Sequence, residues 1–267
     1  KDDPKISTLE GLMGKGYILP APILPPAEYD SVALPTPMST AQTDLPTQAV
    51  LYDAAGREIA RHSFGRLPRD HAELLDLRAL ALQGGLGEGD YGHAELIYDF
   101  RDGGVADGWL HGLFRYTDRR SGHAAETSFG AHMFNHVLTY KGEPQSYAGK
   151  PPGLSTRLFL RIGPKGYDAF CHLIYPVSTE WKATSRTELT LTDGQGNPVA
   201  TETVEIPAGG SYRFTQRGLF SAEACDQAGD DGYVLIRDVT CRLFGYHGLM
   251  AGSRGADSFS LDHMFGF

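Results

Sequence analysis

The sequence contains one series of short motifs twice, in the same order and with few insertions. One shared motif is Asp-x-x-Gly-x-x-aliphatic-Ala, and another ends in His-Met-Phe. The paired segments are "LYDAAGREIA" (51–60) and "LTDGQGNPVA" (191–200), "GDYGHAELIYD" (89–99) and "GDDGYVLIRD" (229–238), "LHGL" (110–113) and "YHGL" (246–249), and "AETSFGAHMF" (125–134) and "ADSFSLDHMF" (256–265). Since a repeat of this kind marks a duplicated structural unit, the sequence predicts two copies of one domain.

The repeat also sets the domain boundaries. We expect an N-terminal tail (1–11), a first repeat (12–136), a linker (137–149) and a second repeat (150–267). The linker is rich in Gly, Pro and Lys and has no sustained periodicity. The segment "GYILPAPILPPAEYDSVALPTP" (16–37) is too rich in proline for a helix, so it is predicted to form extended or edge-strand structure.

Polar and apolar residues alternate within both copies, as in "TELTLTD" (187–193), "SYRFTQ" (211–216) and "YVLIRDV" (233–239). Alternation with period two, rich in β-branched and aromatic residues and broken by turn residues, indicates short strands. The exception is 68–85, where helical spacing suggests a short helix although its counterpart in the second copy reads as a strand. The predicted fold class is all-β, a tandem duplication of two immunoglobulin-like antiparallel β-sandwich domains.

Composition excludes several classes of protein. The net charge is −9 and there is no cluster of Lys or Arg, which argues against binding nucleic acid. No apolar run reaches the length of a membrane span. Cys171, Cys225 and Cys241 lack metal-site spacing and are predicted to be structural thiols, with a Cys225–Cys241 disulfide as the alternative. The chain begins at Lys1 and shows no apolar signal-peptide core, so a leader was either removed or never present; the compartment stays open, and an exported, processed protein in an extracytoplasmic compartment is the favoured alternative.

Histidines recur in both copies, in the His-Gly-Leu and His-Met-Phe segments. If each copy ends in a β-hairpin, the midpoint between His111 and His132 falls on Ser121-Gly122, and the midpoint between His247 and His263 falls on Gly255, both good turn positions. Each copy is therefore predicted to hold two imidazoles that face each other across a strand pair, with side chains about 5 Å apart.

Two interpretations of these histidines remain. They are either structural pairs within an apolar face or half of a metal site for copper or zinc. In the second case His111, His132, His247 and His263 would be metal ligands, and the protein could be an enzyme. Otherwise neither a metal nor another cofactor is expected.

The second copy resembles the sensory rhodopsin transducer family in "LFGYHGLMAGSRGADSFSL" (243–261) and in the preceding "LTDGQGNPVATETVEIPAGGSYRFTQRGLF" (191–220). Members of that family are small β-sandwich proteins. The resemblance implies a non-catalytic, oligomerising binding or signalling module in which His247, Arg254 and Asp257 match the family's pattern. With the corresponding histidine of the first copy, the predicted ligand-binding residues are His111, His247, Arg254 and Asp257.

These observations favour a non-catalytic binding or assembly module whose ligand lies near the last hairpin of each repeat. The partner would be a small ligand or another protein copy, and we expect a homo-oligomer. The two copies could pack about a pseudo-twofold axis through the same patch on each. The alternative function is a metal protein with copper or zinc. A carbohydrate-active enzyme is a third hypothesis, but no carboxylate pair supports it.

Overall fold

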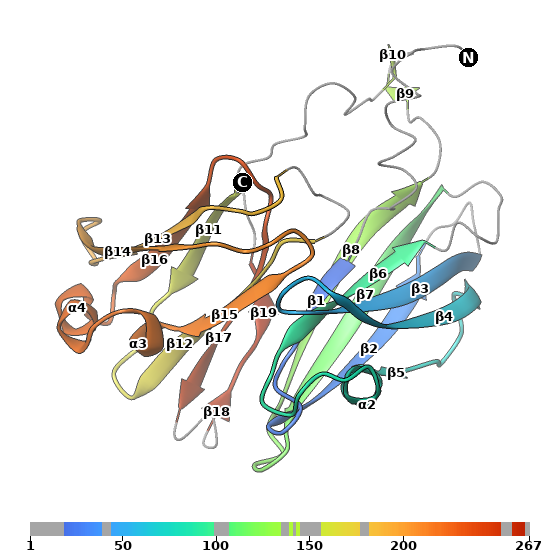
Figure 1. Cartoon of the computed structure of the whole chain (residues 1–267), viewed down its shortest axis with the longest axis horizontal. Coiled ribbons are helices and arrows are strands. Elements are labelled where there is room, and N and C mark those ends of the chain that lie inside the picture. Colours follow the sequence, from blue (N-terminus) through green and yellow to red (C-terminus); the bar gives the residue numbers. More distant parts are fainter. Residues whose placement is uncertain are drawn as a thin grey trace.

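The computed structural model describes residues 19–38, 44–98, 107–134, 139–140, 143–144, 156–176, 182–251 and 258–264. These residues are mostly strands, and the predicted all-β class of antiparallel sandwiches is confirmed (Figure 1). Two units, one from each half of the sequence, lie side by side. The predicted linker contains a short hairpin of β9 (Thr139–Tyr140) and β10 (Glu143–Pro144).

The first unit consists of two four-stranded sheets, in the orders β1-β6-β3-β4 and β5-β2-β7-β8. A short helix, α2 (Leu77–Gln83), follows β5 within the segment whose spacing suggested a helix. The strands are β1 (Leu19–Ile23), β2 (Tyr29–Pro37), β3 (Asp44–Asp53), β4 (Glu58–Pro68), β5 (Leu75–Asp76), β6 (Gly92–Tyr98), β7 (Asp107–Asp118) and β8 (Ala124–Phe134).

The second unit has sheets in the orders β11-β16-β13-β14 and β15-β12-β17-β18, and a further strand, β19, also pairs with β17. This is the strand order of the first unit, as a tandem duplication predicts. Two helices, α3 (Gln216–Leu219) and α4 (Ala222–Ala228), follow β15. The strands are β11 (Thr156–Arg161), β12 (Tyr167–Ile174), β13 (Thr187–Thr192), β14 (Pro198–Val204), β15 (Ser211–Thr215), β16 (Tyr233–Asp238), β17 (Phe244–Ala251), β18 (Ser258–Phe259) and β19 (Asp262–His263).

The repeated Asp-x-x-Gly motif forms the same turn in both units. Asp53 accepts hydrogen bonds from the backbone of Ala55 and Arg57, and Asp193 accepts them from the backbone of Gln195 and Asn197. Both motif glycines have a positive φ, 85° at Gly56 and 90° at Gly196, which costs glycine little. These aspartates therefore stabilise turns, and the shared motif reflects a shared local structure.

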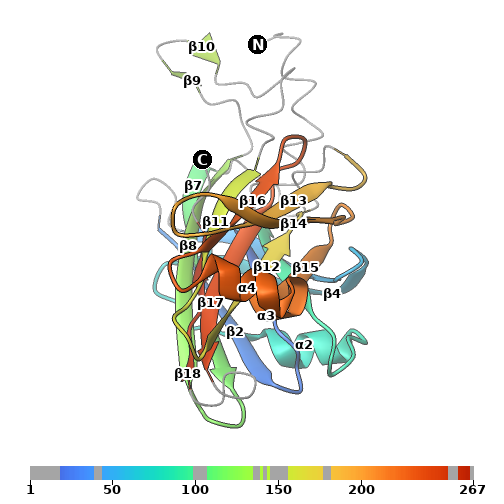
Figure 2. The same ribbon diagram turned by 90° about the vertical axis from the view of Figure 1, so that its left-hand side faces the viewer.

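The second unit covers an open side of the first sandwich. The sheet of β12, β15 and β17 faces the first unit, next to β1 and β8 (Figures 1 and 2). Outward side chains of that sheet, and Leu261 between β18 and β19, join the hydrophobic core of the first unit; the sheet residues are Phe170, Ile174, Tyr246 and Met250. The first unit contributes different strands, so the interface is heterologous, and the expectation of one shared patch about a pseudo-twofold axis is wrong.

Edge strand β1 lies at this interface, and its prolines suit that position. Its Pro20 and Pro22 carry no backbone N–H, so neither leaves a donor buried and unpaired between the units. The Tyr116 hydroxyl donates to the Pro22 carbonyl at 2.9 Å, and the Tyr246 hydroxyl of the second unit donates to the Pro20 carbonyl. The prediction of extended or edge-strand structure is confirmed for the described part of this segment, in which β1 is an edge strand and β2 is paired on both sides. Strand β1 joins the units.

All three cysteines are free and buried, so the structural-thiol prediction is confirmed and the Cys225–Cys241 disulfide is not formed. Within the described ranges, no helix is long and apolar enough to cross a membrane.

Removing the Tyr246 hydroxyl should weaken the contact between the units. In Tyr246→Phe, the buried Pro20 carbonyl loses its partner, so the free energy of unfolding should fall by about 1–3 kcal/mol. Urea denaturation followed by tryptophan fluorescence measures this change. Tyr167→Phe, at an exposed tyrosine, is the control and should leave the midpoint almost unchanged. Equal midpoints for Tyr246→Phe and the unaltered protein would contradict the role of this bond.

The buried His172 should make stability depend on pH. Burial lowers the pKa of His172 well below 6.5; the charges of Arg213 and His93 act in the same direction, and the Gly92 backbone opposes them to a smaller extent. The unfolded chain therefore binds more protons than the folded one below about pH 6.5, and stability should be lost as the pH falls below that value.

Denaturant titrations from neutral to acidic pH measure this loss. His172→Leu should flatten the dependence on pH, whereas His123→Leu, at an exposed position in the β7–β8 turn, should not. An unchanged slope in His172→Leu would show that another group is responsible.

Candidate functional site

A cavity of about 420 Å³ opens on the second unit, between the end of β11 and the strands β17 to β19. Its polar side chains come from four segments of the chain. Apolar groups of Ile162, Pro164, Leu249 and Leu261 complete the lining. The polar lining residues are Arg161, Asp230, Asp231, His247, Ser260 and Asp262.

Strand register places His247 at this cavity. His247 is paired with Cys171 of β12 on one side and with Asp262 of β19 on the other. Its neighbours along β17, Tyr246 and Met250, point to the first unit, so His247 points to the opposite face of the sheet. This face is the inner face of its own sandwich, and the cavity lies where that interior opens.

Two glycines bring the cavity walls close together. A Cβ on Gly163 would lie 2.8 Å from a Leu249 methyl group, and one on Gly248 would lie 1.8 Å from the Ser260 carbonyl oxygen. A larger residue at position 248 would require the backbone to move, and one at position 163 would require the Leu249 side chain to shift. The backbone amide of Leu249 donates to the Ser260 hydroxyl at 2.9 Å, which fixes the Ser260 side chain at the cavity.

The charges of the cavity follow from its contacts. Burial lowers the pKa of His247 below 6.5; Asp262 opposes this shift and His263 reinforces it, so the imidazole is neutral at pH 7. Burial by itself would raise the pKa of Asp262, but hydrogen bonds from Thr127 and the His263 backbone, with the charge of His263, lower it below 3.8. Asp262 is therefore an anion beside a neutral imidazole.

Asp262 also connects the cavity to the first unit. The Thr127 hydroxyl of β8 donates to its carboxylate at 2.7 Å, and the His263 amide donates to the same oxygen at 2.8 Å. The His263 ring lies 5.2 Å from the ring of Phe129, on the side of the first unit. One wall of the cavity is thus held by a contact between the units.

The predicted facing histidine pairs are wrong in both units. His111 is paired with Gly130, and His132 with Trp109, two positions away from the predicted register. His263 is paired with Tyr246, so it lies on the opposite face of the sheet from His247. In the first hairpin, Asp118 accepts hydrogen bonds from the amides of Arg120 and Ser121, which gives a longer turn than the predicted Ser121-Gly122 loop.

The two His-Gly-Leu segments do not occupy equivalent positions. Tyr29-Asp30 and Tyr167-Asp168 begin equivalent strands, β2 and β12. Ala33 and Cys171, each four residues after its tyrosine, are therefore equivalent. Ala33 is paired with Phe114, and Cys171 is paired with His247. His247 therefore corresponds to Phe114 and not to His111. His111 lies on the outer face of β7, away from the sandwich interior.

The other predicted site residues have different outcomes. Arg254 and Asp257 lie outside the described residues, and the side chain of His132 is not described either. Among the side chains that the structure describes, no three His, Cys, Asp or Glu residues converge as metal ligands. Sequence reasoning missed Arg161, Asp230, Asp231, Ser260 and Asp262, which are close to one another only through folding.

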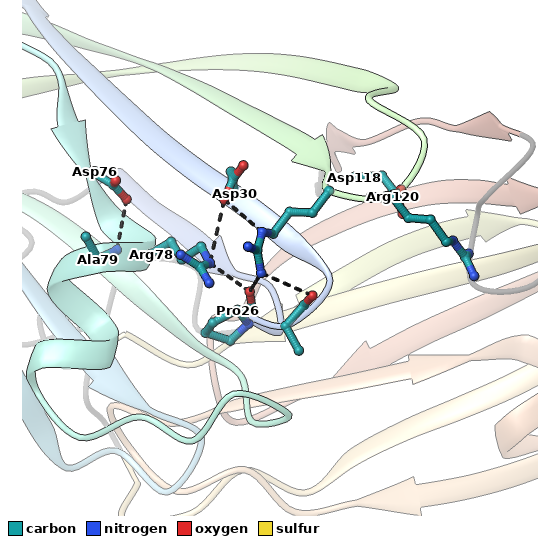
Figure 3. A network of polar contacts seen from close by, with 9 residues as sticks. Pro26, Asp30, Asp76, Arg78, Ala79, Asp118 and Arg120 are labelled. Carbon is teal, nitrogen blue, oxygen red and sulfur yellow. Dashed lines mark hydrogen bonds and ion pairs between the residues drawn. The ribbon is translucent and has the colours of Figure 1, made fainter.

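The equivalent turn of the first unit is held by a network of polar contacts (Figure 3). Asp30 lies 3.6 Å from Arg78 and 3.5 Å from Arg119, and Arg78 donates to the Pro26 carbonyl at 2.7 Å. In the second unit, Asp168 instead accepts from the Arg217 amide at 3.2 Å. No described arginine bonds to the turn after β11 as Arg78 does to the first unit's turn, and residues 162–164 of that turn line the cavity.

Comparisons with known proteins give the chain no family. No family model and no curated protein match it. A solved structure titled "BspA_C_WT" aligns over 93% of this chain and 92% of that chain, with 8% identity and a TM-score of 0.23. A structure described as a beta-glucuronidase from glycoside hydrolase family 2 aligns over 97% of this chain but 26% of its own, with 9% identity and a TM-score of 0.16.

The charge arrangement at His247 can be tested by titration. Because the Asp262 carboxylate raises the pKa of His247, Asp262→Asn should lower that pKa further. NMR spectra of the histidine ring protons across the acidic range measure both values. Asp231→Asn, a matched change at the cavity rim, should have the smaller effect. A higher pKa of His247 in Asp262→Asn would contradict the geometry.

Proposed function

We propose that this chain is a non-catalytic binding module whose second sandwich holds a small polar ligand in the His247 cavity. The observation that supports it is a cavity of about 420 Å³ whose lining combines polar side chains from four segments of the chain with apolar groups, which is typical of small-molecule sites. This function agrees with the resemblance to the sensory rhodopsin transducer family, whose pattern includes His247.

The lining favours a ligand rich in hydrogen-bond donors. Three carboxylates, Asp230, Asp231 and Asp262, face one guanidinium, that of Arg161, and the His247 imidazole is neutral. Carboxylates accept hydrogen bonds, and a neutral imidazole offers one acceptor nitrogen. Hydroxyl or amine groups therefore match the cavity better than a carboxylate or a phosphate.

The contacts of His247 and Asp262 favour a binding role over a catalytic one. No hydrogen bond from a described residue orients the His247 ring as a general base, and the Asp262 carboxylate is already bonded to Thr127 and His263. A catalytic dyad needs a base that is held toward its target by a third group. These side chains instead form fixed walls.

NMR titration with small probes tests the proposal. D-Glucose and ethanolamine supply hydroxyl and amine donors, and acetate is the anionic control. A donor probe should shift the His247 ring resonances, and His247→Leu should weaken its binding by about tenfold, which corresponds to about 1.4 kcal/mol.

The matched control is His111→Leu, because His111 lies on the outer face of the other unit. It should leave probe binding unchanged. The proposal would be wrong if neither donor probe shifted the His247 resonances, or if acetate bound better than both.

A further inference from the structure

The outer edge of β11 carries unpaired backbone groups. The Ile162 amide donates to the Gly232 carbonyl, so amides at alternate positions, those of Leu160 and Leu158, point in the same direction, toward β16. The amides of Arg157, Phe159 and Arg161 then point away from the sheet. Since β11 is the last strand of its sheet, no described strand pairs with them.

The equivalent edge of the first unit is closed. Ile23 of β1 is paired with Gly92, and Ile162 after β11 is bonded to Gly232 in the same way, so these two residues are equivalent. Counting back along each strand, Pro22 corresponds to Arg161 and Pro20 to Phe159. The prolines cannot donate, and their carbonyls bind tyrosine hydroxyls. In the second unit, the same edge has donors, and no strand of the described ranges pairs with it. An exposed edge of this kind can accept a further strand.

The side chains beside this edge are basic and aromatic. Phe159 is 45% exposed, with the Arg157 guanidinium 5.5 Å from its ring. Arg157 lies directly opposite Arg237 on β16. Like charges at such a position repel each other. Glu188 is the residue on the other side of Arg237, but among the described residues no ion pair joins them, and the Glu188 carboxylate accepts from Thr190.

This basic patch lies on a chain with a net charge of −9. A second copy of β11, paired antiparallel about Phe159, would place Arg157 opposite Arg161 and add to the repulsion. An acidic segment would instead neutralise Arg157 and Arg237. Its acidic side chains would lie at that end of β11, because Asp230 and Asp231 are near the other end.

We propose that the edge of β11 binds an extended acidic segment of a partner protein by strand addition. Its backbone bonds to the free groups of Arg157, Phe159 and Arg161. Its acidic side chains pair with Arg157 and Arg237, and an apolar side chain packs on Phe159. The site is separate from the His247 cavity, although Arg161 borders both.

Isothermal titration calorimetry with blocked synthetic peptides tests this site. A peptide of alternating valine and glutamate should bind, and its lysine counterpart should not. N-methylation of alternate amides in the acidic peptide should abolish binding, because it removes the donors of the ladder.

Phe159→Pro introduces into β11 the proline that β1 has at the equivalent position, Pro20. It should weaken binding of the acidic peptide by about tenfold or more. Because the Phe159 amide points outward, this change removes no bond within the sheet. Arg157→Glu combined with Arg237→Glu tests the charges without touching the cavity, and Arg217→Glu, on α3, is the matched control.

Several outcomes would overturn the proposal. They are equal binding of the acidic and the lysine peptide, undiminished binding to Phe159→Pro, and absence of binding to the unaltered protein at low salt. Sedimentation showing a dimer that Phe159→Pro dissociates would assign the edge to a second copy. His247→Leu should leave peptide binding unchanged, so failure of the cavity proposal and failure of this one can be told apart.

Discussion

The burial of edge strand β1 is the constraint on which the arrangement of the two units depends. A sandwich has an open side where its two sheets end, and backbone groups at that side must find partners if they are covered. Prolines at positions 20 and 22 remove the donors, and the hydroxyls of Tyr116 and Tyr246 satisfy the acceptors. Because Tyr246 belongs to the second unit, one of these hydrogen bonds crosses the interface and ties the second unit to β1. The hydrophobic core of the first unit then continues into the outer face of the β12–β17 sheet.

A heterologous interface makes two similar units unequal. The open side of the first unit is covered, and the corresponding side of the second unit faces outward. Sequence differences follow this inequality: Pro20 and Pro22 occupy the covered edge, whereas Phe159 and Arg161 occupy the exposed one. The His247 cavity and the free edge of β11 both lie on this uncovered side. Both proposed binding sites therefore lie on the side of the second unit that the tandem arrangement leaves uncovered.

The sequence predicted the strands and the repeat but not the register of the histidines. Alternation and the Asp-x-x-Gly turns are local signals, and both units carry them in the same places. Register depends on turn length. In the first hairpin, Asp118 pairs with His123 and its side chain accepts from the turn amides, so the turn has four residues instead of the predicted two. His247 corresponds to Phe114, which is three positions after His111. Because an odd shift reverses the direction of a side chain in a strand, the two histidines lie on opposite faces of their sheets. The repeated Tyr-Asp pair at 29–30 and 167–168 was the signal that could have aligned these strands.

The cavity residues could not be found by spacing, because they come from separate segments that only the closed fold brings together. Asp262 shows why this matters for function. Its carboxylate lines the cavity and also accepts a hydrogen bond from Thr127 of the first unit. A ligand that draws this carboxylate toward itself must compete with Thr127, and a tighter interface between the units must hold the cavity wall more firmly. In the proposed binding function, the occupancy of the cavity and the contact between β8 and β19 would therefore be linked. The first unit thus supports the proposed binding site of the second unit, although it contributes no described residue to the cavity lining.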